Sequence, residues 1–91
     1  MILLKRVVLD VLKPHQPSGL EFAKTLAECG PGYRVHYTVT AVDEKTETVV
    51  IAIEGEDIQF DAISETISEL GASLHSVDEV EVINVGESKQ N

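Results

Sequence analysis

Residues 33–54, YRVHYTVTAVDEKTETVVIAIE, decide the fold of this chain because they have the pattern of a β-hairpin. Apolar and polar residues alternate over residues 33–43, as they do along a strand that buries one face. The polar segment 43–46 predicts a turn, and the β-branched run 48–54 predicts the returning strand. We therefore expect two antiparallel strands at the centre of the chain.

A helix is predicted on each side of this hairpin. Before it, Ser18 and Glu21 have the spacing of a capping box, and the apolar periodicity that follows stops at the breaker Gly30-Pro31-Gly32. After it, apolar residues recur three and four positions apart, which is the period of a helix with one buried face: Phe60, Ile63, Ile67 and Leu70. Gly71 stands where a glycine commonly ends such a helix.

Strands are predicted at both ends of the chain. Residues 4–12 form a β-branched run that Pro14 stops, and residues 74–85 form the last strand. The order is then β-α-β-β-α-β, and right-handed crossovers place both helices on one face of the sheet. We expect an α+β, ferredoxin-like sandwich with antiparallel strand order 4-1-3-2. Residues 1–85 would form one domain, and residues 86–91 a polar tail.

The face of the sheet without helices is predicted to be apolar. Four aliphatic residues are expected there on adjacent strands: Val8, Leu12, Val42 and Val50. Scattered exposed valines are common, but a contiguous patch on a short chain favours a contact with another subunit. An exposed edge strand would offer a second contact. The sequence thus predicts a homo-oligomer.

Composition excludes several partners. The 91 residues carry a formal net charge of −9, which repels nucleic-acid phosphates and anionic lipids. The opening apolar run is too short for a signal peptide and lacks a preceding basic segment. The single Cys29 allows no internal disulfide and is typical of a reducing compartment. We therefore expect a cytoplasmic protein that binds neither nucleic acid nor membranes.

Most chemistries that use this fold need residues that are missing here. RNA-binding versions stack bases on aromatic side chains of the central strands, where this chain has Val8, Asp10, Val50 and Ala52. Soft-metal chaperones need a Cys-x-x-Cys pair, and phosphoryl transfer needs an anion cradle at a helix N-terminus. No nucleophile–base pair can be argued from spacing, so we do not expect an enzyme.

One polar cluster is predicted where the end of the first strand meets the start of the last. It contains Asp10, His15, His75 and Asp78, with the turn at Asp43 nearby. Carboxylates with one or two imidazoles suit a divalent cation such as Ca²⁺, and more imidazole favours Zn²⁺. The alternative is a solvated polar strand end. We expect no cofactor other than such a cation, which would bind weakly.

Three segments resemble a small archaeal family, domain of unknown function 211. They are VVLDVLKPH (residues 7–15), IAIEGEDIQFDAI (51–63) and LHSVDEV (74–80). The resemblance implies a ferredoxin-like fold, an archaeal cytoplasmic protein and a multi-subunit homo-oligomer, with cation binding by analogy. It brings no established activity. The segments carry the polar candidates Asp10, Lys13, His15, Glu54, His75, Asp78 and Glu79 without a role for any of them. The second strand, residues 33–40, resembles the family least.

The sequence therefore leaves two alternative functions. The first is a non-catalytic homo-oligomeric module with weak cation binding. The alternative is a small-ligand-binding regulatory domain of the amino-acid-sensing kind, with residues 14–19 approaching a ligand whose identity is unknown.

Overall fold

The computed structural model describes residues 1–86 and confirms the predicted element order. The elements are β1 (Ile2–Pro14), α1 (Gly19–Ala27), β2 (Arg34–Val42), β3 (Thr46–Glu54), α2 (Phe60–Glu69) and β4 (Ser73–Asn84). The first strand is longer than the predicted residues 4–12, and the last strand has the predicted length but begins and ends one residue earlier. The predicted polar tail, apart from Gly86, lies outside the described residues.

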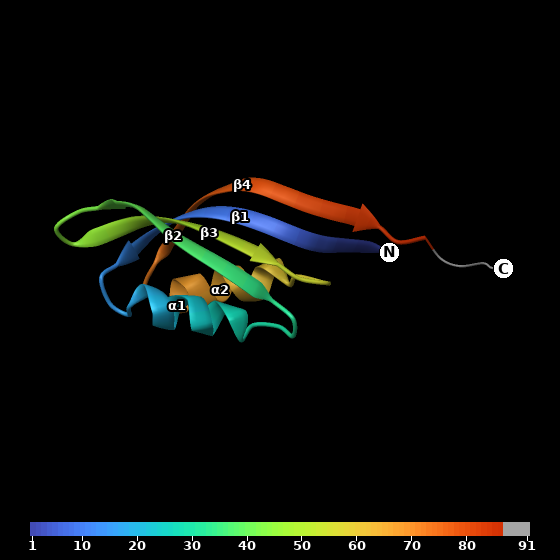
Figure 1. The fold of residues 1–91 in the computed structure, drawn as a ribbon, viewed down its shortest axis with the longest axis horizontal. Helices are drawn as coiled ribbons and strands as arrows, with labels where there is room; N and C mark the ends of the chain where they lie inside the picture. The colour runs from blue at the N-terminus through green and yellow to red at the C-terminus, as the bar shows by residue number, and fades with distance from the viewer. Residues whose placement is uncertain (87–91) are drawn as a thin grey trace.

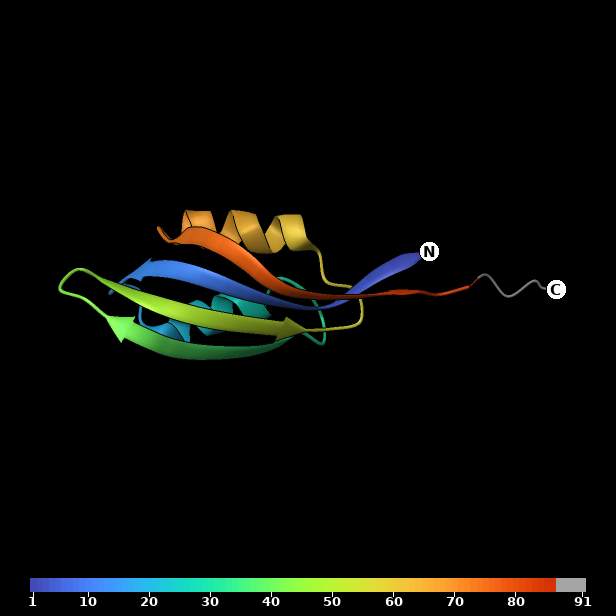
Figure 2. The same ribbon diagram turned by 90° about the horizontal axis from the view of Figure 1, so that it is seen from above.

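The four strands form one sheet with order β2-β3-β1-β4, and every neighbouring pair is antiparallel. Both helices lie on the same side of this sheet (Figure 1). Seen from above the sheet, α1 lies beneath the strands and α2 runs next to β4 (Figure 2). This is the ferredoxin-like α+β sandwich that the sequence predicted, and its other face carries no helix.

The core lies between the helices and alternate residues of the two central strands. The sheet contributes Val7, Leu9, Val11, Val49, Ile51 and Ile53, and the helices contribute Phe22, Leu26, Ile63 and Ile67. Each of these side chains is at most 1% exposed. The alternating pattern places the residues between them, Val8 and Asp10 of β1 and Val50 and Ala52 of β3, on the open face.

The start of α1 and the end of α2 have the structures that the sequence predicted. The Ser18 hydroxyl accepts a hydrogen bond from the Glu21 backbone N–H at 3.2 Å, which caps α1. Gly71 follows α2 with φ +83, a left-handed conformation that favours glycine.

Bulges in the edge strands change which way several side chains point. In the β1–β4 pairing, Asp10 lies opposite Ser76 and Val11 opposite Leu74, so His75 is an extra residue of β4. The same pairing shifts between Val8 and Leu9 of β1, opposite Glu79 and Val77, which makes Asp78 a second extra residue. Both residues therefore sit at irregular positions of the edge strand.

A third bulge corrects one prediction about the open face. The register of β2 against β3 shifts between Val39 and Ala41, so Val42 pairs with Glu47. The Glu47 carboxylate points toward the helix side, where it meets the buried Lys13. Because paired residues share a face, Val42 does not lie with Val8, Leu12 and Val50 on the open face.

Candidate functional site

A hollow of about 250 Å³ opens on the face of the sheet that carries no helix. It is lined by Asp10, Val11, Leu12, Thr48 and His75, and we call it the Asp10 hollow. Leu12 and Thr48 are paired across β1 and β3, and the bulge in β4 brings His75 beside them. Two of the four residues predicted for a cation site, Asp10 and His75, thus line the same hollow.

Asp78 lies near this hollow along β4. Asp10 is paired with Ser76, and the Ser76 hydroxyl donates a hydrogen bond to Asp78 Oδ1 at 2.8 Å. Asp10 and Ser76 therefore lie side by side on β1 and β4. The Asp78 carboxylate is engaged by its own strand.

His15 lies elsewhere. Its Nδ1 is 3.4 Å from Glu47 Oε2, and its Nε2 is 3.1 Å from the Asp43 carbonyl oxygen and 3.0 Å from that of Glu44. The expected proximity to the turn at Asp43 is present, but His75 is not part of it. Within residues 1–86 no group of three or more His, Cys, Asp or Glu side chains is placed to hold a metal ion. A single chain thus does not assemble the predicted four-residue site.

A polar cluster that the sequence analysis did not identify lies under the start of α1. The Lys13 side chain is 0% exposed, and its Nζ donates to the Pro14 carbonyl oxygen at 2.7 Å. Nζ also lies 3.6 Å from Glu47 Oε1 and 5.9 Å from the centre of the Phe22 ring. The Tyr37 hydroxyl donates to the same Glu47 oxygen at 3.2 Å. Lys13 lies two residues after the buried Val11 and so on the same face of β1. This alternation is the sequence signal that could have identified Lys13 as buried.

The cluster shifts the pKa values of its members. The His15 pKa is raised, first by its hydrogen bond to Glu47 and then by the Glu44 carbonyl. The Glu47 pKa is lowered, with the hydrogen bond to His15 as the largest cause. Burial and then the Glu47 charge raise the pKa of Tyr37 to about 12. All three pKa shifts favour the same ionic state. In that state the Glu47 carboxylate is charged and lies between the cations of Lys13 and His15, and the Tyr37 hydroxyl donates a hydrogen bond to it.

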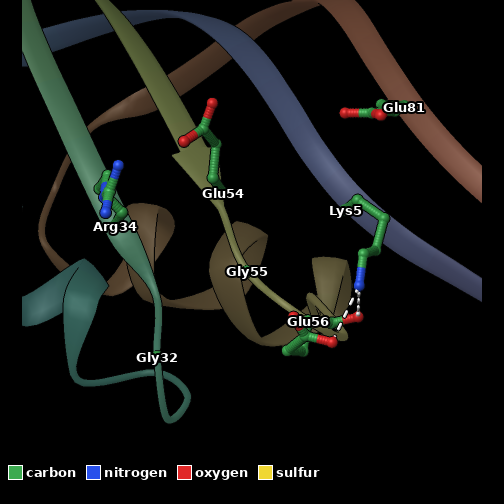
Figure 3. A pocket seen from close by; sticks show the side chains of 7 residues that line it. All are labelled: Lys5, Gly32, Arg34, Glu54, Gly55, Glu56 and Glu81. Atoms are coloured by element: carbon green, nitrogen blue, oxygen red, sulfur yellow. Dashed lines mark hydrogen bonds and ion pairs between the residues drawn. The ribbon is translucent and has the colours of Figure 1, made fainter.

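A larger hollow, about 400 Å³, lies at the opposite end of the sheet and opens broadly to solvent (Figure 3). Its charged lining residues are Lys5, Arg34, Glu54, Glu56 and Glu81. Most of these charges already have partners. Lys5 Nζ contacts Glu56 Oε1 at 3.0 Å, and Arg6 binds the Glu54 carboxylate and, through Nε, Glu79 Oε2 at 3.1 Å. The wide mouth and internal pairing indicate a solvated charge network that links β1, β3 and β4.

The most exposed apolar surface lies along β4. Val77, Val80 and Val82 are 43%, 59% and 55% exposed, and we call them the valine row. Val77 and Val80 are paired with the buried Leu9 and Val7, and Val82 is paired with Leu4, which packs against the core. The row therefore continues the core side of the sheet at its edge, where helix cover ends.

Among the described residues no helix is long and apolar enough to cross a membrane.

Two comparisons place the chain among known proteins. Residues 5–88 match the model of domain of unknown function 211, which is described as an uncharacterized ArCR family. The chain is also similar to uncharacterized protein MJ0319 of Methanocaldococcus jannaschii, with 43% identity over 77 residues that cover 85% of this chain and 79% of the relative. The family match over residues 5–88 covers both hollows, the polar cluster and the valine row. The chain therefore belongs to the domain of unknown function 211 family.

Proposed function

We propose that this protein is a non-catalytic homo-oligomeric module whose subunits meet along β4. The observation that carries the proposal is the valine row, three side chains on the core side of the sheet that remain about half exposed. Apolar surface that continues a core gains free energy when it is covered, at about 25 cal/mol per Å². A second copy offers the same surface, so a self-complementary contact is available without any other partner.

The pairing of the start of β1 with the end of β4 supports the same contact. β3 ends opposite Arg6, so residues 2–4 of β1 have only residues 82–84 of β4 as a strand neighbour. We call this two-stranded segment the terminal ribbon, and Figure 1 shows it running beyond both helices. Ile2 is 64% exposed in it, and Ile83 is 38% exposed. Isolated two-stranded segments are marginally stable in water, so a neighbouring subunit would stabilise this one.

The free edge of β4 indicates which half of this strand makes the contact. Its bulges at His75 and Asp78 interrupt the regular ladder in the first half of the strand, which disfavours pairing there. From Val80 to Asn84 the strand has no extra residue. The register shift in this half falls at Lys5 of β1, so the half of β4 without its own extra residues is the one that carries the terminal ribbon.

The open-face patch predicted from the sequence is a weaker contact surface. Val8 and Val50 are partly buried by their neighbours, and Leu12 is 43% exposed. Asp10 interrupts the patch between them, and Val42 is absent from it. The valine row and the terminal ribbon therefore carry the proposal.

A pair of matched valine substitutions tests this surface. Val80 lies on one edge strand and Val39, which is 44% exposed, lies on the other. Size exclusion with light scattering should show that Val80→Asp lowers the molar mass to that of one chain, while Val39→Asp keeps the mass of the unaltered protein. Circular dichroism spectra would verify that both variants are folded.

Two results would contradict the proposed surface. If Val80→Asp keeps the full molar mass, the contact does not use β4. If both variants dissociate equally, the added charge rather than its position is responsible.

A further inference from the structure

We propose that the Asp10 hollow binds a small organic cation, an alkylammonium whose charged end pairs with the Asp10 carboxylate while its carbon chain lies on Leu12. All lining residues come from one chain, so this inference does not depend on the assembly proposed above. The hollow lies on the open face near the start of β4, whereas the proposed assembly uses the valine row on the core side and the terminal ribbon.

The sign of the ligand's charge follows from Asp10. Asp10 is partly buried as a residue, and within residues 1–86 its carboxylate has neither a hydrogen-bond nor an ion-pair partner. The cation nearest in sequence, Lys13, points to the helix side and is engaged by Glu47. A bound ammonium group would give this carboxylate a partner through charge-assisted hydrogen bonds. The net charge of −9 attracts cations to the surface and repels anions.

The number of ligand atoms favours an organic cation over a metal ion. The hollow offers one carboxylate, the Thr48 hydroxyl and the His75 imidazole. Calcium takes about six to eight oxygen ligands, and zinc takes about four ligands in structural sites. One carboxylate is sufficient for an ammonium group, which forms charge-assisted hydrogen bonds to it. A neutral imidazole has one nitrogen that can accept a further hydrogen bond from the same ammonium group.

The size and walls of the hollow restrict the rest of the ligand. Its volume of about 250 Å³ lies just below the range of about 300–1,000 Å³ typical of small-molecule sites. Leu12 supplies the aliphatic lining next to the carboxylate, because the Val11 side chain is buried in the core on the other side of the sheet. A short alkyl chain therefore fits the hollow and can lie against Leu12.

Nuclear magnetic resonance titration with n-butylammonium tests the inference directly. We expect amide shifts concentrated at residues 10–12, 48 and 75, and binding at least about tenfold tighter than that of 1-butanol, which has the same chain without the charge. Butyrate, which carries the opposite charge, should cause no such shifts.

Two matched variants distinguish binding by the Asp10 carboxylate from nonspecific attraction to the negative charge of the protein. Asp10→Asn and Glu65→Gln each remove one negative charge, and Glu65 is exposed on α2, away from the open face. Asp10→Asn should weaken butylammonium binding at least about tenfold, while Glu65→Gln should change it by less than about twofold.

Each other outcome overturns the inference. Equal binding of butylammonium and butanol would show an apolar hollow without charge recognition. Equal effects of the two variants would show nonspecific attraction. Shifts at Asp10 with millimolar Ca²⁺ but not with butylammonium would assign the hollow to a metal ion.

Discussion

Lys13 Nζ lies 3.6 Å from Glu47 Oε1, and this contact joins a fully buried lysine of β1 to a carboxylate of β3 that is 21% exposed. The two residues are direct partners in the antiparallel register. A buried ammonium group is costly unless its hydrogen bonds are satisfied, and here the Pro14 carbonyl oxygen provides the shortest of them. The pair thus connects the end of β1 to the β2–β3 hairpin beneath α1.

Replacing Lys13 separates its packing from its charge. Lys13→Ala removes a fully buried side chain and should lower the free energy of unfolding by about 2–5 kcal/mol, as large-to-small core substitutions do. Lys13→Met keeps most of the volume and should cost less than about 1.5 kcal/mol, because Glu47 retains His15, Tyr37 and partial solvent exposure. Urea denaturation measures both. Because both variants lack the ammonium group, a loss in Lys13→Met as large as that in Lys13→Ala would show that charge, not packing, dominates at this position.

Stability should depend on pH through His15 and Glu47. The folded-state pKa of His15 is raised above 6.5, so its contribution is complete below pH 6.5 and is lost as pH rises through the raised value. The folded-state pKa of Glu47 is lowered below 4.5, so its contribution is complete above pH 4.5 and is lost as pH falls through the lowered value. The pair should therefore stabilise the fold most between pH 4.5 and 6.5.

Two histidine variants identify the source of this dependence. Denaturation midpoints measured below pH 6.5 and again well above it should differ less in His15→Gln than in the unaltered protein. His36→Gln, on an exposed position of β2, should retain the full difference. If His15→Gln retains it as well, the imidazole contacts at Glu47 and the turn do not contribute to stability.

Gly19 should not tolerate a side chain. A Cβ at this position would lie 2.6 Å from Tyr37 Cε1, which is closer than carbon atoms approach. Tyr37 is held by its hydrogen bond to Glu47 and by the Phe22 ring, whose centre is 6.1 Å away. Gly19→Ala should therefore cost about 1–3 kcal/mol, as overpacking does. In a double-mutant cycle, Tyr37→Leu should remove part of that cost, and strict additivity would argue against the contact.

Val50→Asp tests whether the open face also takes part in assembly. Val50 is partly buried beside Asp10, and the contact proposed here lies on β4. We expect the molar mass of this variant in solution to equal that of the unaltered protein. A fall to the mass of one chain would restore the surface that the sequence pattern suggested.

Local patterns were sufficient to predict the architecture. The alternation in β2 and β3, the cap at Ser18 and the glycine at position 71 are all encoded by neighbouring residues, and the structure confirms each. The strand order followed from the handedness of the crossovers.

The sites depended on information that local patterns do not hold. A bulge is set by how two distant strands pair, and the one after Val39 moved Val42 to the helix side. The bulge at His75 brought this residue to Asp10, while His15 turned instead toward Glu47. Lys13 follows the alternation of the core and is fully buried, although lysine is among the residue types that are least often buried.

The molar mass of the unaltered protein in solution tests the central claim most directly. Sedimentation equilibrium at several concentrations up to tens of micromolar, at moderate salt, would give this mass independently of molecular shape. We predict an integral multiple, two or more, of the 9.9 kDa mass of one chain, because the valine row and the terminal ribbon are then covered by another copy. A mass of one chain throughout that range would contradict the proposal that this protein works as a homo-oligomer.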